Sequence, residues 1–284
     1  MKAHDRRLTA ARPDLAAAHL RGAIEATRYA DGRRLQVVAG VIDVKNAPTP
    51  DAPLDTQALA GETVIVYEDD EGFAWGQLES DGYVGYLPST SLSPPGPPVT
   101  HRVAVKRTFV YPGPNMKLPP QAVLPFGATV AIAETRGDFA MLADGGAIFT
   151  AHLRNADFRA PDFVATGESF LGAPYLWGGK TPDGLDCSGL VQVCLTAAGI
   201  ACPRDTDMQE RALGMALAEG VPLQRGDLVF WRGHVGIMQD AGRLLHANGF
   251  HMLVESEPFA QARARIAKNS FGAVTSIRRL PPAA

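Results

Sequence analysis

The sequence predicts a multidomain protein in which two small all-β barrels precede one α+β domain. Three observations lead to this prediction. The chain has 284 residues, enough for two or three domains of about 100–200 residues each. Its first half alternates short apolar runs with turn residues, and a proline-rich stretch at residues 93–98 interrupts that pattern. Beyond residue 160, runs with helical spacing are followed by further strand-like runs.

The composition excludes several classes of protein. Hydrophobic residues make up 46% of the chain, so it is not wholly disordered. The formal net charge of −3 lacks the basic excess typical of nucleic-acid binders. Three cysteines cannot form a disulfide framework and fit a reducing compartment. Because the sequence shows no secretory signal and no apolar run of the ~20 residues that cross a bilayer, we expect a cytoplasmic location and no membrane partner.

The first half is expected to be organised as follows. Pro13 and helical spacing predict a helix over residues 13–27, within an N-terminal segment at 1–30. A first β module at 31–93 and a second at 100–158 flank a proline-rich linker at 94–99. The strands expected in the first module are Leu35–Val41, Thr63–Tyr67, Phe73–Leu78 and Tyr83–Leu87. Those expected in the second are Val103–Val110, Gly127–Ala133, Phe139–Leu142 and Gly146–Phe149.

The α+β domain is expected to span residues 159–284. Helical spacing predicts helices at 161–171, 187–199 and 207–219, and strands are expected at 227–232, 234–239 and 243–247. The second helix would place Cys187 in its first turn. Free backbone N–H groups and the positive end of the helix dipole stabilise a thiolate there, and the same groups can bind an oxyanion. Cys187 is therefore the candidate nucleophile, whereas Cys194 and Cys202 are expected to be packing thiols.

A thiolate nucleophile needs a nearby base, and two histidines follow at suitable positions. If Asp240-Ala241-Gly242 forms a three-residue hairpin loop, His234 and His246 fall on the same face as diagonal neighbours. A two-residue loop would place them on opposite faces. The predicted arrangement is a nucleophile, a base and an orienting group. The same three residues could also hold zinc, but no fourth ligand is placed nearby, so we expect no metal and no cofactor.

These residues lie in segments that resemble the NlpC/P60 family of cysteine peptidases. The matching segments are Tyr175-Leu176-Trp177-Gly178-Gly179, Asp186-Cys187-Ser188-Gly189-Leu190-Val191, Gly226-Asp227-Leu228-Val229-Phe230, His234-Val235-Gly236-Ile237 and His246-Ala247. The resemblance implies a papain-like catalytic domain with Cys187 as nucleophile, His234 as general base and His246 as the polar third residue. It also implies that Tyr175 lies near the oxyanion site. Trp177, Asp186 and Ser188 are expected to serve substrate binding.

The front half is similar to one subgroup of this family. Two bacterial SH3-like modules before the catalytic domain resemble the γ-D-glutamyl-L-diamino acid endopeptidases of murein-peptide recycling. There the first module helps to bind the free N-terminal amine of the substrate. Matching segments are Leu59-Ala60-Gly61-Glu62, Gly82-Tyr83-Val84-Gly85-Tyr86 and Pro203-Arg204-Asp205-Thr206, which point to Glu62, Tyr83 and Asp205. Thr206 stands where the subgroup has serine and keeps the hydroxyl.

The resemblance implies hydrolysis of the γ-D-Glu–diamino acid bond in murein peptides that begin with a free L-Ala. An ammonium group is best held by carboxylates and an aromatic side chain, which Glu62, Asp205 and Tyr83 supply. Each has a plainer alternative, since Asp205 can cap the following helix, Glu62 can be a solvated acid and Tyr83 can belong to the module core. Two rival functions stay open, an amidase or acyltransferase on the same scaffold and a wall-peptide-binding protein.

Overall fold

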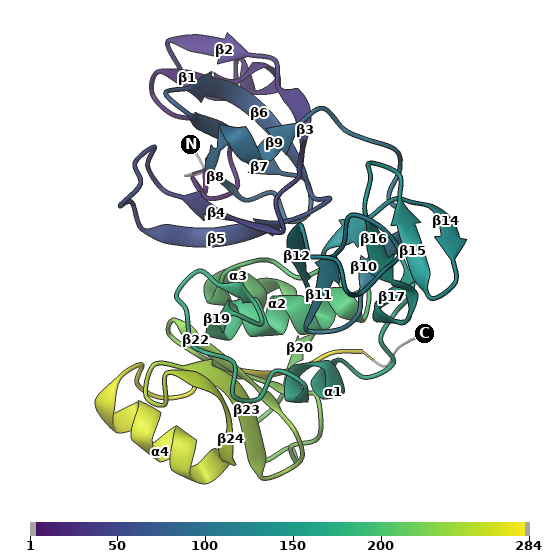
Figure 1. Cartoon of the computed structure of the whole chain (residues 1–284). Helices are drawn as coiled ribbons and strands as arrows, with labels where there is room; N and C mark the ends of the chain where they lie inside the picture. Colours follow the sequence, from purple (N-terminus) through teal and green to yellow (C-terminus); the bar gives the residue numbers. More distant parts are fainter. Residues whose placement is uncertain (1–3, 282–284) are drawn as a thin grey trace. The chain divides into compact units, whose positions relative to one another are not determined.

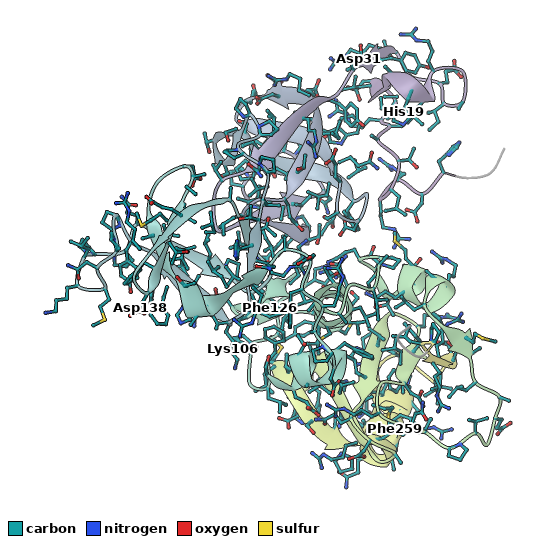
Figure 2. The ribbon with its side chains drawn as sticks, turned by 90° about the vertical axis from the view of Figure 1, so that its right-hand side faces the viewer. His19, Asp31, Lys106, Phe126, Asp138 and Phe259 are labelled. Atoms are coloured by element: carbon teal, nitrogen blue, oxygen red, sulfur yellow. The ribbon has the colours of Figure 1, made fainter. Side chains whose placement is uncertain are left out.

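The computed structural model of the chain describes residues 4–281, so both extreme ends of the predicted domains lie outside it. The chain divides into two units, Met1–Asp157 and Phe158–Ala284 (Figure 1). Side chains fill the interior of each unit (Figure 2). The three helices predicted in the second half all have counterparts in the second unit.

The helix predicted over residues 13–27 is wrong. Leu15–Ala17 forms strand β1, which pairs in parallel with β2 (Arg28–Ala30), and only Ala18–Leu20 is a short 3-10 helix, η1. All three side chains of β1 are buried, and β1 packs into a small core that contains Trp75 of the first β module. Alanine-rich sequence favours a helix locally, but this burial against the module favours an extended chain.

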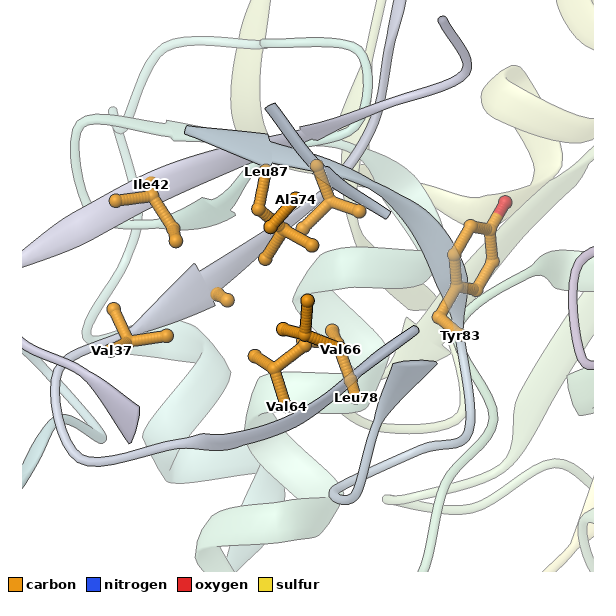
Figure 3. Packing of buried hydrophobic residues seen from close by; sticks show 10 residues of the cluster. Val37, Ile42, Val64, Val66, Ala74, Leu78, Tyr83 and Leu87 are labelled. Atoms are coloured by element: carbon orange, nitrogen blue, oxygen red, sulfur yellow. The ribbon is translucent and has the colours of Figure 1, made fainter. Parts of the chain in front are cut away.

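The first β module is a seven-stranded antiparallel sheet with the order β5-β4-β8-β7-β6-β3-β9. Its strands are β3 (Arg33–Val37), β4 (Val41–Lys45), β5 (Leu54–Leu59), β6 (Thr63–Asp70), β7 (Phe73–Leu78), β8 (Val84–Pro88) and β9 (Leu92–Ser93). Alternating residues such as Val64 and Val66 point into one core, shown in Figure 3. Among the described residues β5 and β9 remain the outer strands, so this sheet does not close into a barrel.

The second β module contains three small sheets around one core. Its strands are β10 (His101–Val103), β11 (Arg107–Val110), β12 (Ala122–Pro125), β13 (Thr129–Val130), β14 (Ile132–Arg136), β15 (Phe139–Leu142), β16 (Ala147–Phe149) and β17 (Leu153–Asn155). Leu59 and Ala60 of the first module complete this core. Both modules end alike, because a 3-10 helix, η2 (Ser89–Ser91) or η3 (Thr150–His152), leads into a last strand that pairs with the first strand of its module.

The second unit is built on a six-stranded antiparallel sheet with the order β20-β25-β21-β22-β23-β24. Its strands are β20 (Met215–Ala216), β21 (Leu228–Trp231), β22 (His234–Met238), β23 (Arg243–Asn248), β24 (Leu253–Pro258) and β25 (Ser276–Arg279), and a separate small hairpin pairs β18 (Lys180–Thr181) with β19 (Gly184–Leu185). The helices are α1 (Phe163–Glu168), α2 (Cys187–Ala197), α3 (Thr206–Ala212) and α4 (Phe259–Asn269), and Phe259 is labelled in Figure 2. Helix α2 packs against β22 and β23.

Several elements of this unit differ from those predicted from the sequence. The helix predicted over 207–219 ends at Ala212, because Gly214 has a φ of +54° and its backbone packs directly against Arg279. The following residues form β20, which pairs with β25. Strand β24, helix α4 and strand β25 were not predicted. Within residues 4–281, no helix is long and apolar enough to cross a membrane.

Candidate active site

Cys187 is the first residue of α2 and is buried. The preceding Asp186 is the N-cap, with an extended backbone and a side chain that accepts a hydrogen bond of 2.6 Å from the N–H of Gly189. The cysteine therefore lies where the apolar spacing of the sequence predicts it, at the positive end of the helix. Its own side chain contacts Thr206, with 3.8 Å between Sγ and Oγ1.

The Asp186 carboxylate joins the segments around the cysteine. Its second oxygen accepts a hydrogen bond of 2.8 Å from the N–H of Gly178. Arg204 donates hydrogen bonds of 3.0 and 2.7 Å to the two carboxylate oxygens. Arg204 also donates to the Ser188 hydroxyl at 2.8 Å. Sequence reasoning assigned no role to Arg204, although it lies between Pro203 and Asp205 in a segment already singled out. All these groups are buried, so Asp186 and Ser188 bond to protein donors beside the nucleophile.

The histidine pair confirms the predicted three-residue loop. Met238 pairs with Leu244, and the N–H of Gln239 donates 2.9 Å to the carbonyl of Arg243, which leaves residues 240–242 as the loop. His234 and His246 then lie on one face, and Nε2 of His234 is 2.8 Å from Nδ1 of His246. Both rings are buried.

The chain of hydrogen bonds continues beyond the two histidines. His246 Nε2 is 2.7 Å from a carboxylate oxygen of Glu257 on β24. Arg265 on α4 donates to both oxygens of that carboxylate at 2.6 and 2.5 Å. The sequence analysis missed both residues, because neither β24 nor α4 was predicted. Since His246 uses both ring nitrogens in hydrogen bonds, it presents no free lone pair to a zinc ion.

Burial shifts the pKa values of Cys187 and His234 toward their neutral forms. Burial raises the pKa of Cys187 to about 11, and the charge of Asp186 adds to this, whereas the N–H of Val235 and the Thr206 hydroxyl act in the opposite direction. Burial also lowers the pKa of His234 to about 3, with a further contribution from His246. Burial therefore favours the thiol form of Cys187 and the neutral form of His234, and it opposes the thiolate expected from the position at the helix start.

Aromatic side chains fix the plane of the His234 ring. Phe271 stacks on it with a centroid distance of 5.2 Å and an interplanar angle of 6°. Trp231, the cross-strand partner of His234, contacts the ring with a centroid distance of 5.5 Å. The His234 ring therefore has little freedom to turn away from its hydrogen-bond partner.

Comparisons with known proteins identify the family of the chain. A sequence model of the NlpC/P60 family matches residues 172–267, and one described as "Bacterial dipeptidyl-peptidase Sh3 domain" matches 44–92. A Bacillus subtilis (strain 168) protein named Gamma-D-glutamyl-L-lysine dipeptidyl-peptidase is 32% identical over 231 residues, which span 69% of this chain and 73% of that protein. The chain belongs to the NlpC/P60 family. It carries an SH3-like domain followed by an NlpC/P60 domain, as the sequence analysis predicted.

Two further similarities bear on this NlpC/P60 protein. A Gamma-D-glutamyl-L-lysine dipeptidyl-peptidase of Bacillus cereus is 36% identical over 107 residues, which cover 35% of this chain and 32% of that relative. The crystal structure of an NlpC/P60 family protein from Bacillus cereus ATCC 10987 superposes with a TM-score of 0.74 at 21% identity, covering 88% of this chain and all of that one. The superposition supports the fold across most of the chain.

Three other candidate residues lie in the NlpC/P60 domain. Tyr175 is half-buried, and burial raises its pKa, with further contributions from Cys187 and Asp186, so the phenol keeps its proton. Trp177 is 67% exposed and free to contact a ligand. Asp205 occupies the N-cap position of α3, yet its side chain makes no capping hydrogen bond.

The remaining two candidates, Glu62 and Tyr83, lie in the first unit. The Glu62 carboxylate accepts a hydrogen bond of 2.9 Å from the N–H of Leu59, which closes the turn before β6. Tyr83 is 4% exposed and belongs to the core of the first module, so its ring has the packing role that was the alternative to amine binding. The ring lies at the edge of the cluster, and its hydroxyl is directed away from the aliphatic side chains (Figure 3).

Proposed function

We propose that this NlpC/P60 protein is a cysteine endopeptidase that hydrolyses the γ-D-Glu–diamino acid bond of murein peptides with a free N-terminal L-Ala. The observation that carries the peptidase activity is the buried pair of His234 and His246 on the hairpin packed against α2, the helix that begins with Cys187. A thiol, an imidazole base and an orienting group are the components that acyl transfer through a thioester requires.

The neutral resting state defines the first step. As the Cys187 sulfur attacks the γ-carbonyl carbon, its proton moves to the free ring nitrogen of His234, so no separated charges precede the attack. Backbone N–H groups at the start of α2 and the protonated Tyr175 are proposed to stabilise the oxyanion. His234 then protonates the departing amine as the C–N bond breaks. Water hydrolyses the thioester and releases L-Ala-γ-D-Glu.

Recognition of the free amine is proposed to set the substrate class. Asp205, Glu62 and Tyr83 are the proposed partners of the ammonium group, because carboxylates and an aromatic side chain are the groups that best hold a cationic amine. The names of the Bacillus relatives point to the same bond. Trp177 is proposed to contact the peptide through its exposed ring, while Asp186, Ser188 and Thr206 position the segments that surround it.

A site that binds a charged amine discriminates against N-acylated peptides, because the carboxylates would then lack a partner. Intact wall peptides are acylated at that position, so we propose soluble turnover fragments as the substrate. The three cysteines are free, which fits a reducing compartment such as the cytoplasm. A role in recycling murein peptides inside the cell is therefore the proposed physiological setting.

The second β module at 100–158 is proposed to be a second SH3-like domain. The support is its ending, in which a strand, a 3-10 helix and a final strand follow the same order as in the first module. Backbone angles at the start of the two 3-10 helices agree closely, with φ and ψ of −63° and 116° for η2 and −62° and 118° for η3. Such repetition of a local pattern is typical of duplicated modules.

Mass spectrometry of tripeptide digests tests the proposed function. The wild-type protein and Cys187→Ala are incubated with L-Ala-γ-D-Glu-L-Lys, its diaminopimelate analogue and their N-acetylated forms. We expect L-Ala-γ-D-Glu from the free-amine peptides only, and none with Cys187→Ala. Faster cleavage of the acetylated peptides would refute amine recognition, and full activity of Cys187→Ala would refute the mechanism.

A further inference from the structure

The hydrogen-bond chain behind the active site ends in a group that can only accept. Burial alone would raise the pKa of Glu257, but the hydrogen bonds from Arg265 and His246 outweigh it and lower the pKa to about 2. At neutral pH the side chain is therefore a carboxylate, with no proton to donate. Arg265 donates to both of its oxygens and is itself covered by the ring of Phe250, 4.3 Å from the guanidinium carbon.

An acceptor at one end determines the position of each proton along the chain. Because Glu257 accepts, Nε2 of His246 must carry the proton in their 2.7 Å hydrogen bond. Burial lowers the pKa of His246, although Glu257 opposes this, so the ring is neutral and its Nδ1 has a lone pair. Nε2 of His234 must then donate to that lone pair across 2.8 Å. The remaining ring nitrogen of His234, Nδ1, is left without a proton.

We infer that Glu257, held by Arg265, is a positioning residue that selects the tautomers of His246 and His234 and so leaves Nδ1 of His234 as the free base for Cys187. Its effect on rate rests on the proposed function of this site, whereas the tautomers exist without substrate. Glu257 and Arg265 thereby affect the rate of the reaction, although neither is one of the three residues predicted to be catalytic. This arrangement of protons also explains why a second histidine orients the base, since imidazole transmits a proton preference from one nitrogen to the other.

Glu257→Leu tests the inference because it removes the acceptor at Nε2 of His246. A glutamine would not serve, because Oε1 of Glu257 accepts from both Arg265 and His246, and an amide oxygen in that position would keep the same tautomers. Without the acceptor, His246 loses its preference for the Nε2–H tautomer, and part of the His234 population carries its proton on Nδ1. A carboxylate-to-amide change in a Ser-His-Asp triad costs about 10⁴-fold in kcat through the wrong tautomer. Glu257 is one ring further away, so we expect a loss of at least about tenfold in kcat with KM little changed.

The decisive measurement is NMR of the full chain labelled with ¹⁵N-histidine, at pH 7 without substrate. We expect the Nε2–H tautomer for both histidines in the wild type and a mixture of the Nε2–H and Nδ1–H tautomers in Glu257→Leu. Glu255→Leu is the matched control, because Glu255 lies directly across from His246 in the strand register but accepts from the N–H of Ser256. That variant should keep the wild-type tautomers and activity.

The outcomes separate this inference from the proposed function. Nδ1–H tautomers in the wild type, or unchanged tautomers in a folded Glu257→Leu, would overturn the inference even if the peptidase activity is present. The wild-type measurement decides the matter if Glu257→Leu does not fold. Absence of murein-peptide cleavage by a wild type that shows the expected tautomers would instead refute the proposed function and leave the proton arrangement standing.

Discussion

Arg204 and Asp186 form a buried ion pair beside Cys187, with hydrogen bonds of 3.0 and 2.7 Å and side chains only 1% and 9% exposed. The same carboxylate caps the helix that begins with Cys187 and accepts from the loop at Gly178. The position of the thiol therefore depends on a residue 17 positions later in the sequence. Charged groups buried in this way are costly to leave without their partner.

Replacing Arg204 by methionine should strongly destabilise the protein. The change leaves the Asp186 charge buried without its cation, which typically costs about 3–5 kcal/mol. The measurement is urea unfolding followed by tryptophan fluorescence. Arg211→Met is the control, because its pair with Asp207 is largely exposed and should contribute less than about 0.5 kcal/mol. Equal effects of the two substitutions would contradict the role assigned to the buried pair.

A plot of kcat/KM against pH should show no decrease on the acid side near the ordinary pKa of histidine. Burial lowers the pKa of His234 to about 3, so the base stays unprotonated as the pH falls from 7 to 5, and kcat/KM should stay level over that range. At the alkaline end, burial raises the pKa of Cys187 to about 11, so the first decline should come from the substrate amine near a pH of about 8. Steady-state kinetics on the free-amine tripeptide will measure both. An acid limb with an apparent pKa near 6.5 would contradict this account.

Gly236→Ala should reduce activity because Gly236 lies close to His246 on the neighbouring strand. A Cβ at this position would lie 2.8 Å from Leu244 Cδ1 and 3.2 Å from His246 Cβ, so the side chain of Leu244 must move and His246 must give way slightly. We expect kcat to fall severalfold while the protein stays folded, as judged by circular dichroism. Gly249→Ala is the control, because a Cβ there meets no atom within 4 Å. Wild-type kcat in Gly236→Ala would show that the histidine pair tolerates the displacement.

Thr206 should contribute through its hydroxyl. Its Oγ1 lies 3.8 Å from Cys187 Sγ, so Thr206→Ser keeps the contact and should preserve kcat/KM. Thr206→Val keeps the shape but loses the hydroxyl, and a weak hydrogen bond worth at most about 1 kcal/mol predicts a loss of about two- to fivefold. Kinetics of the two variants side by side will test this. A larger loss in the serine variant would mean that the methyl group matters more than the hydroxyl.

Glu257 should make the stability of the protein depend on pH in acid. Burial opposes ionisation, but Arg265 and His246 lower the folded-state pKa to about 2, below the ordinary value of 4.5. The stabilisation is therefore fully present above pH 4.5 and is lost as the pH falls through 2. The free energy of unfolding, measured from pH 6 to 2, should fall less steeply for Glu257→Gln than for the wild type. Parallel curves would contradict the depressed pKa.

The centre of the site could be predicted from sequence because its signals are local. Helical spacing after Cys187 placed the thiol at a helix start, and a single assumption about the loop at Gly242 brought His234 and His246 together. Glu257 and Arg265 carry no comparable local signal, since their importance arises only when β24 pairs with β23. Arg204 was missed because the partner of a buried charge is a tertiary property that neighbouring residues do not reveal.

The N-terminal segment has a practical consequence for any shortened form of this protein. Arg12 lies over the Trp75 ring at 4.5 Å and donates 2.9 Å to the Tyr86 hydroxyl, while Leu15 and Ala17 cover the same aromatic cluster. The predicted N-terminal helix would suggest a shortened chain that begins at residue 31. Such a chain exposes that cluster and loses the hydrogen bond that the N–H of Val84 donates to the carbonyl oxygen of Arg7. The N-terminal segment therefore covers apolar side chains of the first module. A shortened protein that is meant to stay monomeric and soluble must keep the residues from Arg7 onward.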